Sequence, residues 1–274
     1  MEYSVEEFEQ AKQKIISRLT PLPVKPVDAP QAYLIVGQPG AGKTTMARLF
    51  TSQLKKNVIF ISGDEYRRFH PRYDTLVKEH GDDAVFYTQK FAGQMTEALI
   101  DELSSRKYNL IIEGTLRTVE VPAKTKFLLD RRGYDVTMAA ILVRPEVSYL
   151  STIMRYEKFK QLGSTPRKTP KDHHDLVVSS IVKNIDFLHR TKEFPHIQLY
   201  NRQGERLCDT KETPDINPGD LFRKEFERPL SQKERDKIVQ EYAAYVSKEE
   251  IVSVLDEYKG SLQKHLEQGQ RTAR

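Results

Sequence analysis

The sequence has little cysteine and no long apolar run, and each absence excludes a class of protein. A single cysteine, Cys208, allows no internal disulfide and no zinc site built on cysteines, and we expect it to be an ordinary hairpin residue. No stretch approaches the ~18 apolar residues that a membrane-spanning helix requires, so no membrane partner is expected. The first residues, 1–7, are too acidic and polar for a secretory signal, which predicts a cytoplasmic protein.

Motifs of several other protein classes are also missing. The seven histidines show neither H-x-x-x-H nor H-E-x-x-H spacing, so a transition-metal site is not expected. The G-x-S-x-G elbow of serine hydrolases is absent. So is the guanine-reading N-K-x-D motif, although the choice between ATP and GTP stays open. The 44 basic and 39 acidic residues are interleaved and give a net charge of only +5, which predicts no nucleic-acid partner.

Short apolar strands alternate with longer helical stretches along most of the chain. Ser4 and Glu7 have the spacing of a capping box that opens a helix to about Leu19, and four prolines make residues 20–30 a semi-rigid linker. The predicted strands are 32–36, 58–61, 109–112, 136–143 and 197–200. The predicted helices are 43–55, 84–106, 122–132, 146–160 and 170–192. This alternation predicts an α/β fold with a mostly parallel, doubly wound sheet and helices on both faces.

Turn and cap signals divide the chain into three parts. Thr169 is expected to cap the helix that follows it, with Pro170 as its first residue. Residues 200–207 suggest a hairpin with a glycine turn, and the Pro- and Gly-containing segment 213–219 marks a break. Ser231 is expected to open the main helix of a charged segment, which either packs on the core or binds a partner. We expect an N-terminal helix and linker (1–30), an α/β core with a lid segment around 155–170 (31–214), and a C-terminal helical extension (215–274).

The motif with the clearest chemistry is Gly37-Gln38-Pro39-Gly40-Ala41-Gly42-Lys43-Thr44, which fits G-x-x-x-x-G-K-[ST] and directly follows the predicted strand 32–36. Such a loop turns on glycines and starts a helix whose free N–H groups point at phosphate oxygens. We therefore expect a nucleoside triphosphate to be bound by this loop and Thr45. Lys43 is expected to hold the β- and γ-phosphates, and Thr44 the Mg²⁺ ion.

Polar residues follow two further predicted strands, where ligands of doubly wound sheets bind. Asp64 ends the run Ile61-Ser62-Gly63-Asp64 and is our candidate base for the proton of a substrate hydroxyl. A Walker B-type contact to Mg²⁺ and a helix N-cap are its alternatives. Glu113, Thr115 and Arg117 follow the next strand and suit a sugar or another polyhydroxylated substrate. Ordinary turn chemistry is the alternative for that group.

Three more residues are candidates from their place on predicted helices. Glu97 projects away from the apolar stripe of its helix, and periodicity alone predicts that it is exposed. Arg155 and Arg167 bracket a segment with Pro and Thr between two helices, which resembles the lid of small kinases. Such arginines place positive charge on the transferring phosphoryl group, while surface ion pairing is the alternative for each.

Taken together, these blocks resemble the zeta-toxin family of bacterial toxin–antitoxin kinases. The resemblance covers about residues 31–200, in order and at matching separations. It rests on the P-loop, Gly63-Asp64, residues 108–118, residues 153–157, and 167–175. It is weak over the Pro-rich linker and over 215–274.

The resemblance implies a kinase that uses ATP and Mg²⁺ to phosphorylate the 3′-hydroxyl of N-acetylglucosamine in UDP-N-acetylglucosamine. It implies that Lys43 and Thr44 serve ATP and Mg²⁺, that Asp64 is the base, and that Arg155 and Arg167 contact the ATP phosphates. The residues implied to line the sugar-nucleotide site are Glu97, Glu113, Thr115 and Arg117, with Asn109 a weaker candidate. A small helical antitoxin that blocks the nucleotide site is implied as a partner.

Two other functions remain open from the sequence. One is a P-loop kinase for an antibiotic, a nucleoside or a polynucleotide 5′-hydroxyl. The other is a nucleotide-dependent switch in which hydrolysis only changes shape. The oligomeric state is not predicted.

Overall fold

One mixed sheet organises the chain, and its strands are mostly parallel. The computed structural model describes residues 3–21, 23–163 and 168–271. The strands are ordered β2-β3-β1-β4-β5-β6. Their bounds are β1 Gln31–Val36, β2 Ile59–Ile61, β3 Leu110–Gly114, β4 Asp135–Ile141, β5 Ile197–Tyr200 and β6 Arg206–Asp209. β2 and β3 are parallel, and β5 and β6 form the expected antiparallel hairpin. The predicted α/β fold with a mostly parallel sheet is confirmed.

The chain forms two compact units that interleave along the sequence. The first contains the chain up to Ile35, then Thr44–Gly114 and Glu120–Ala139. The second contains Val36–Lys43, Thr115–Val119 and the chain from Ala140 onward. β1 and β4 each run from the first unit into the second. The phosphate loop therefore belongs to a unit whose other residues come mostly after residue 140.

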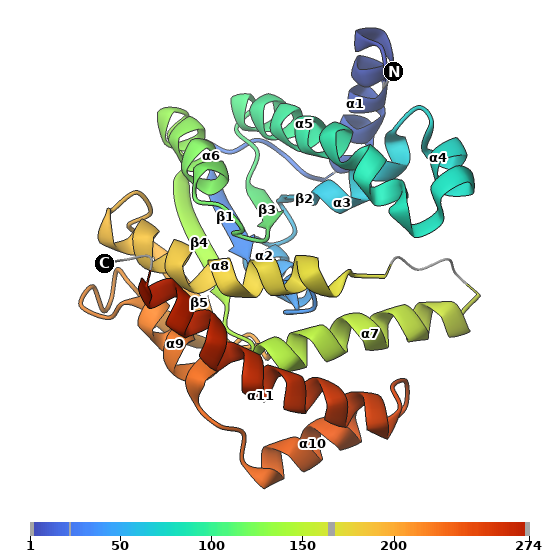
Figure 1. The fold of residues 1–274 in the computed structure, drawn as a ribbon. Coiled ribbons are helices and arrows are strands. Elements are labelled where there is room, and N and C mark those ends of the chain that lie inside the picture. Colours follow the sequence, from blue (N-terminus) through green and yellow to red (C-terminus); the bar gives the residue numbers. More distant parts are fainter. Residues whose placement is uncertain (1–2, 22, 164–167, 272–274) are drawn as a thin grey trace. The chain divides into compact units, whose positions relative to one another are not determined.

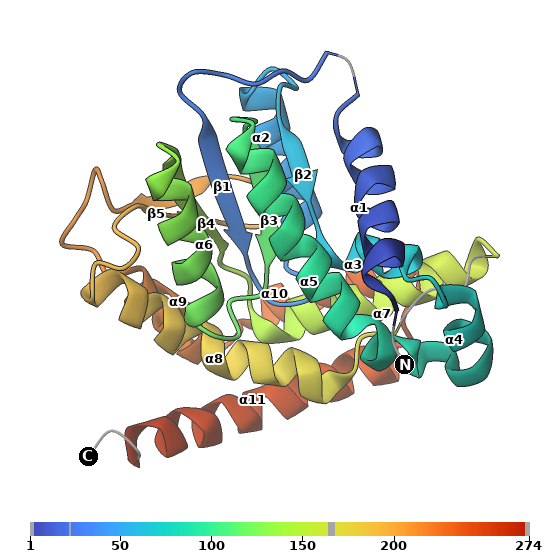
Figure 2. The ribbon, with the colours of Figure 1, turned by 90° about the horizontal axis from the view of Figure 1, so that it is seen from above.

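In the first unit, helices follow the local signals of the sequence. The helices are α1 Val5–Leu19, α2 Lys43–Gln53 (whose first residue belongs to the second unit), α3 Gly63–Tyr66, α4 Tyr73–His80, α5 Ala84–Ser105 and α6 Glu120–Arg131. Two short 3₁₀ turns, Arg67–Phe69 and Gly81–Asp83, flank α4. The predicted capping box of Ser4 and Glu7 is present at the start of α1. Figure 2 shows α1 beside α5, and α1 buries Ala11, Ile15 and Ile16.

The helices of the second unit are α7 Pro145–Gln161, α8 Lys171–Arg190, α9 Pro218–Glu227, α10 Gln232–Tyr242 and α11 Lys248–Arg271. The prediction that Thr169 caps the predicted helix 170–192 is wrong by one residue. Pro170 is the N-cap, because its backbone is still extended (ψ 137°), and α8 begins at Lys171. Ser231 does form a capping box with Glu234, but it opens α10, and α11 is the longer helix. No helix in the described part of the chain is long and apolar enough to cross a membrane.

The C-terminal extension packs on α7. One apolar cluster joins Leu150 of α7 to residues of α10, α11 and the turn between them, and Figure 1 shows both helices alongside α7. The buried members from the extension are Ile238, Tyr242, Val246, Ile251, Val254, Leu255 and Tyr258. Burial of that much apolar surface is the main force that can hold the extension in place. The sequence left open whether the charged C-terminal segment packs on the core or binds a partner, and the structure shows that it packs on α7.

A buried cation fixes the last turn of α9 against the start of α7. The guanidinium of Arg144 donates to the carbonyl oxygens of Glu225 and Arg228, at 2.7 and 2.8 Å. Its Nε lies 2.7 Å from the carboxylate of Glu146, and the two side chains are only 10% and 2% exposed. The last carbonyl groups of a helix lack intrahelical partners, so a cation there satisfies them and complements the helix dipole.

We expect Arg144→Met to lower the free energy of unfolding by about 3–5 kcal/mol, because it leaves the Glu146 carboxylate buried without its cation. Urea denaturation measures the change. Arg223→Met is the matched control, since Arg223 also serves α9 but forms an exposed pair with Asp220, and such pairs contribute about 0–1 kcal/mol. Equal losses in the two variants would contradict the role given to Arg144.

Candidate active site

The phosphate loop makes a turn that only glycine permits, and it lies directly against α7. Gly40 and Gly42 have φ values of +80° and +101°, in the left-handed region. A Cβ atom on Gly40 would lie 2.0 Å from the carbonyl oxygen of Ser148, far inside the 3.0 Å that real Cβ atoms keep. The loop thus follows the sequence prediction, leaving β1 and entering α2. Its backbone conformation depends on contact with the first turn of α7.

The side chains of the loop are held by its own backbone and by the end of β4. The Lys43 ammonium, 9% exposed, donates to the carbonyl oxygens of Gly37 and Gln38 at 3.0 and 3.1 Å. The fully buried Gln38 amide donates to the carbonyl of Val143 at 2.6 Å. Thr44, in the first turn of α2, is exposed. A glycine turn, a lysine and a helix-opening threonine are the donor set that a triphosphate with Mg²⁺ requires, so the residues present fit these ligands.

His174 of α8 is fully buried, and its two ring nitrogens meet groups from α7 and α11. Nε2 lies 2.9 Å from Ser148 Oγ, and Nδ1 lies 3.0 Å from Tyr258 Oη. The Ser148 hydroxyl donates to the Pro145 carbonyl at 2.9 Å, so Nε2 must donate to Ser148. Both Ser148 and His174 are 0% exposed, which closes this serine–histidine pair to any substrate.

Charge around His174 is arranged so that the imidazole stays neutral. Burial lowers its pKa and the adjacent Asp175 opposes that shift, while Lys171 and Lys43 add to it. Burial raises the pKa of Asp175, but hydrogen bonds donated by Lys171 and Tyr258 help to hold it well below its usual range. The Lys171 ammonium, in turn, lies 4.9 Å from the ring centroid of Tyr258. This network ties α8 and α11 to the turn of α7 that touches the phosphate loop.

Asp64 and Glu113 lie at the carboxyl ends of β2 and β3 in the first unit, as predicted. Ser62 donates to the Glu113 carboxylate at 2.8 Å and so joins the two strand ends. Asp64 is the second residue of α3, and its carboxylate accepts a bond from Arg67 Nε at 2.9 Å. The alternative that Asp64 is the N-cap is wrong, because Ser62 holds that position. The 58% exposed carboxylate of Asp64 is open to a ligand.

The loop after β3 is held by a residue that the sequence did not reveal. Leu116 is buried at φ +56°, an unusual conformation for a residue with a side chain. The Asn184 amide of α8 donates to the carbonyl oxygens of Leu116 and Arg117, both at 3.0 Å. Thr115 is half-buried and the Arg117 side chain is exposed. The strained turn therefore presents Arg117 from a fixed backbone.

Glu97 and Asn109 occupy different surroundings within the first unit. Glu97 is exposed, as its helical position predicted, and pairs with Lys124 of α6 at 3.0 Å. Asn109 is buried before the amino end of β3, where its amide accepts from the Gln31 N–H and donates to the Asn57 carbonyl, both at 2.9 Å. Glu113 lies at the other end of the same strand. A substrate-binding role for Glu97 and Asn109 stays a prediction.

The two predicted lid arginines fall at the end of α7 and beyond it. Arg155 is an exposed residue of α7, which continues to Gln161. Arg167 lies outside the residues that the structure describes. A phosphate-binding role for both arginines stays a prediction.

The sequence analysis did not identify the residues that support the phosphate loop from distant parts of the sequence. Ser148 contacts Gly40, and Cγ of Arg202 lies 3.5 Å from where a Cβ of Gly42 would be. Arg202 follows β5 by two residues, so the rule that ligands bind beyond strand ends, applied to this strand too, would have identified it. No local signal identifies Ser148 or Asn184, since both act through partners far away in the sequence.

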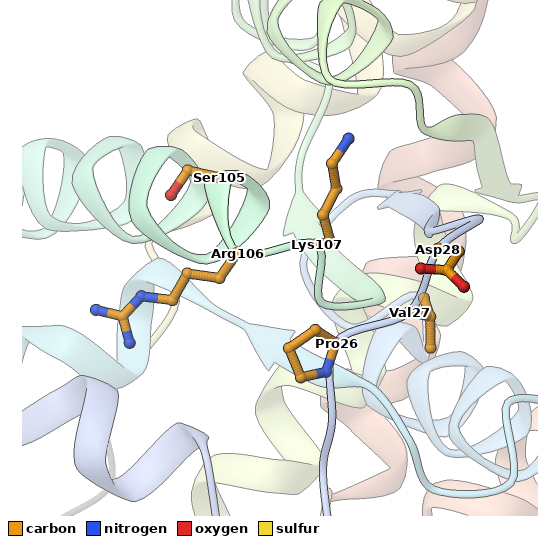
Figure 3. Close-up of a pocket in the computed structure, with 6 residues that line it drawn as sticks. All are labelled: Pro26, Val27, Asp28, Ser105, Arg106 and Lys107. Carbon is orange, nitrogen blue, oxygen red and sulfur yellow. The ribbon is translucent and has the colours of Figure 1, made fainter.

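A pocket of about 360 Å³ lies in the first unit (Figure 3). Residues 26–28 of the linker and residues 105–107 at the end of α5 line it. The chain enters β3 at Leu110, so the pocket is near the amino end of that strand, whereas Glu113 is at its carboxyl end. It is not part of the candidate active site.

We expect Gly40→Ala to abolish nucleotide binding and to destabilise the fold by at least ~1–3 kcal/mol, because the new methyl group collides with the Ser148 backbone. Gly93→Ala is the control, since a Cβ there meets nothing within 4 Å in the middle of α5. That change should stabilise the protein by about 0.5–1 kcal/mol. Calorimetric titration with Mg-ATP and thermal unfolding measure both effects. Unimpaired binding by Gly40→Ala would contradict the described contact.

Acidification below the ordinary histidine pKa of about 6.5 should destabilise the protein through His174. The unfolded chain binds a proton there while the folded protein, with its lowered pKa, does not. Stability is therefore complete above about pH 6.5 and falls as pH drops toward the folded pKa. The midpoint of thermal unfolding from pH 7.5 to 5.5 measures this. A His174→Gln variant should show a flatter profile, and an equally steep one would exclude His174 as the cause.

The chain is similar in sequence to one protein family and to several of its members. The family model described as "Zeta toxin" matches residues 17–213. Toxin PezT of Streptococcus pneumoniae serotype 4 (strain ATCC BAA-334 / TIGR4) is 44% identical over 212 residues, covering 77% of this chain and 83% of that protein. Toxin zeta of Streptococcus pyogenes is 42% identical over 211 residues, covering 77% of this chain and 74% of its own length.

Solved structures extend the likeness beyond residue 213. A structure from the PezAT chromosomal toxin–antitoxin system of Streptococcus pneumoniae superposes with a TM-score of 0.79 at 38% identity, over 92% of this chain and 98% of that one. The AvrRxo1-ORF1:-ORF2 complex with ATP has a TM-score of 0.51 at 14% identity, over 93% and 87% of the two chains, and shares the fold only. From the matched family model and the extent of these identities, the chain belongs to the zeta toxin family.

Proposed function

We propose that this protein phosphorylates the 3′-hydroxyl of the N-acetylglucosamine in UDP-N-acetylglucosamine, with ATP as donor, and is the toxin of a toxin–antitoxin pair. Family membership and fold make it a kinase-type phosphotransferase. The observation that carries the proposal is the phosphate loop, with Lys43 and its two left-handed glycines, in a zeta toxin chain. The acceptor is proposed on the family resemblance.

The proposed reaction transfers the γ-phosphoryl group in one displacement. Asp64 takes the proton of the acceptor hydroxyl, whose oxygen forms a bond to the γ-phosphorus as the bond to the leaving ADP oxygen breaks. Lys43 and the loop N–H groups hold the phosphates, and Thr44 is the ligand for Mg²⁺. When bound, Mg²⁺ neutralises charge on the phosphate oxygens. Support for Asp64 comes from its place at a strand end and its exposed carboxylate.

The remaining predicted residues are assigned to binding. Glu113, Thr115 and Arg117 are proposed to hold the sugar nucleotide, an assignment supported by the fixed backbone at Leu116. Glu97 and Asn109 are proposed for the same ligand on the resemblance alone. Arg155 and Arg167 are proposed to contact the ATP phosphates.

A small helical antitoxin that covers the nucleotide site is proposed as the partner, and the cytoplasm as the place of action. Support for a partner comes from the related structure, which is described as part of a toxin–antitoxin system. Such a partner would inhibit by occupying the site, so nucleotide and antitoxin should compete.

The acceptor assay tests the proposal directly. Purified protein with ATP, Mg²⁺ and UDP-N-acetylglucosamine should yield ADP and a sugar nucleotide one phosphate heavier, detected by mass spectrometry. Turnover of a different hydroxyl compound, with none of this one, would reject the substrate and leave the kinase activity. ADP release without any phosphorylated acceptor would instead indicate a nucleotide switch.

Asp64→Asn should lower kcat by about a hundredfold or more, the usual effect of removing a general base, while Mg-ATP still binds. Asp74→Asn is the matched control, because Asp74 is an exposed acid in the first turn of α4 and should leave kcat unchanged. Full activity in Asp64→Asn would give Asp64 a structural role only.

A further inference from the structure

The second unit contains a chain of hydrogen bonds between the phosphate loop and the C-terminal extension. It begins at Arg202, in the turn between β5 and β6, whose Cγ lies 3.5 Å from where a Cβ of Gly42 would be. Arg202 Nη1 is 2.6 Å from the hydroxyl of Tyr242, at the end of α10. The Tyr242 hydroxyl is 2.7 Å from Ser151 Oγ of α7, and Ser151 in turn donates to the Val147 carbonyl at 2.7 Å.

Chemistry determines the direction of the first bond in this chain. Arginine only donates, so the Tyr242 oxygen accepts from Arg202. The Tyr242 hydroxyl in turn has two partners on α7, because it lies 2.7 Å from Ser151 Oγ and 3.2 Å from the Val147 carbonyl oxygen. The order is therefore Arg202 to Tyr242 to α7. Each bond polarises the next, and the first is charge-assisted, so the chain is stronger than its separate parts.

Burial makes this arrangement costly to disturb. Tyr242 is 0% exposed within the cluster that joins the extension to α7, and the Arg202 side chain is only 26% exposed. The carboxylate of Glu241, 3.9 Å from Arg202 Nη1, adds a second attraction from α10. The arginine is therefore fixed at its head by α10, while its stem lies beside Gly42, the glycine directly before Lys43.

We propose that Arg202 is a positioning residue for the phosphate loop and that Tyr242 holds it there, so that the C-terminal extension sets the affinity for the nucleoside triphosphate. The inference rests on the proposed function, in that the loop must bind this ligand. The apparent affinity of a loop for its ligand is its intrinsic affinity multiplied by the fraction of time that the loop spends in its binding-competent conformation. Gly42 has the widest conformational freedom of any residue type and is in the left-handed state here. The proposed effect of the neighbouring Arg202 stem is to limit the other conformations that Gly42 can adopt.

The variants Tyr242→Phe and Arg202→Met test the chain of bonds. Tyr242→Phe keeps the buried ring and removes only the hydroxyl, and Arg202→Met keeps an unbranched stem without the charge. Each should weaken binding of Mg-ATP about five- to tenfold, the effect of one lost bond to a charged group, as measured by calorimetric titration. KM for ATP should rise by the same factor while kcat and KM for the acceptor stay unchanged. Arg202→Lys, which keeps a donor and a stem, should recover part of the loss.

A double-mutant cycle separates positioning from general stability. If Tyr242 acts through Arg202, the double variant should bind Mg-ATP no more weakly than Arg202→Met alone. Tyr245→Phe is the matched control, because Tyr245 packs against the same cluster without joining the chain of bonds, and it should bind as the wild type does.

Three results would overturn the inference, and they are distinguishable. Wild-type affinity in both single variants, with only a lower midpoint of thermal unfolding, would make Tyr242 and Arg202 purely structural and leave the proposed function intact. Additive losses in the double variant would likewise reject action through Arg202. Failure of the wild-type protein to bind Mg-ATP would reject the proposed function together with this inference.

Discussion

The close backbone contact between Gly40 and Ser148 is the constraint on which the second unit depends. It presses the phosphate loop against the first turn of α7, so the position of α7 determines the shape of the loop. α7 is fixed in turn by Arg144 at its start, by His174 behind Ser148, and by the apolar cluster around Leu150. Packing far from the loop thus determines whether its N–H groups converge on a phosphate.

Elements with a strong local signal could be predicted from the sequence. The capping boxes at Ser4 and Ser231 are present, and the apolar stripe on α5 is buried as its period requires. The prediction of a helix start was wrong where two neighbouring residues could both be the N-cap. Pro170, not Thr169, caps α8, because its own extended backbone delays the helix by one residue. The position of the extension was not predictable, since its charged faces hide the buried stripe that packs on α7.

The positions of the residues that are proposed to carry the chemistry were easier to predict than the groups that support them. Lys43 belongs to a motif of fixed spacing, and Asp64 follows a predicted strand. Ser148 and Asn184 act through groups that are distant in the sequence, and nothing in their immediate neighbours reveals this. Arg202 could have been identified from its place just beyond β5. Periodicity correctly predicted that Glu97 is exposed, but exposure alone does not decide between a solvent-facing acid and a ligand contact.

The interleaving of the two units has a consequence for synthesis of the chain on the ribosome. The ribosome synthesises residues 36–43 before their neighbours in the same unit. These neighbours are Val143, Ser148 and Arg202, which follow more than a hundred positions later. Contacts between such distant segments form slowly and late. A nascent chain therefore carries the nucleotide motif without a rigid phosphate cradle until residue 202 has been synthesised. The proposed phosphoryl transfer can begin only after that point, which delays its effect on the cell that makes the protein.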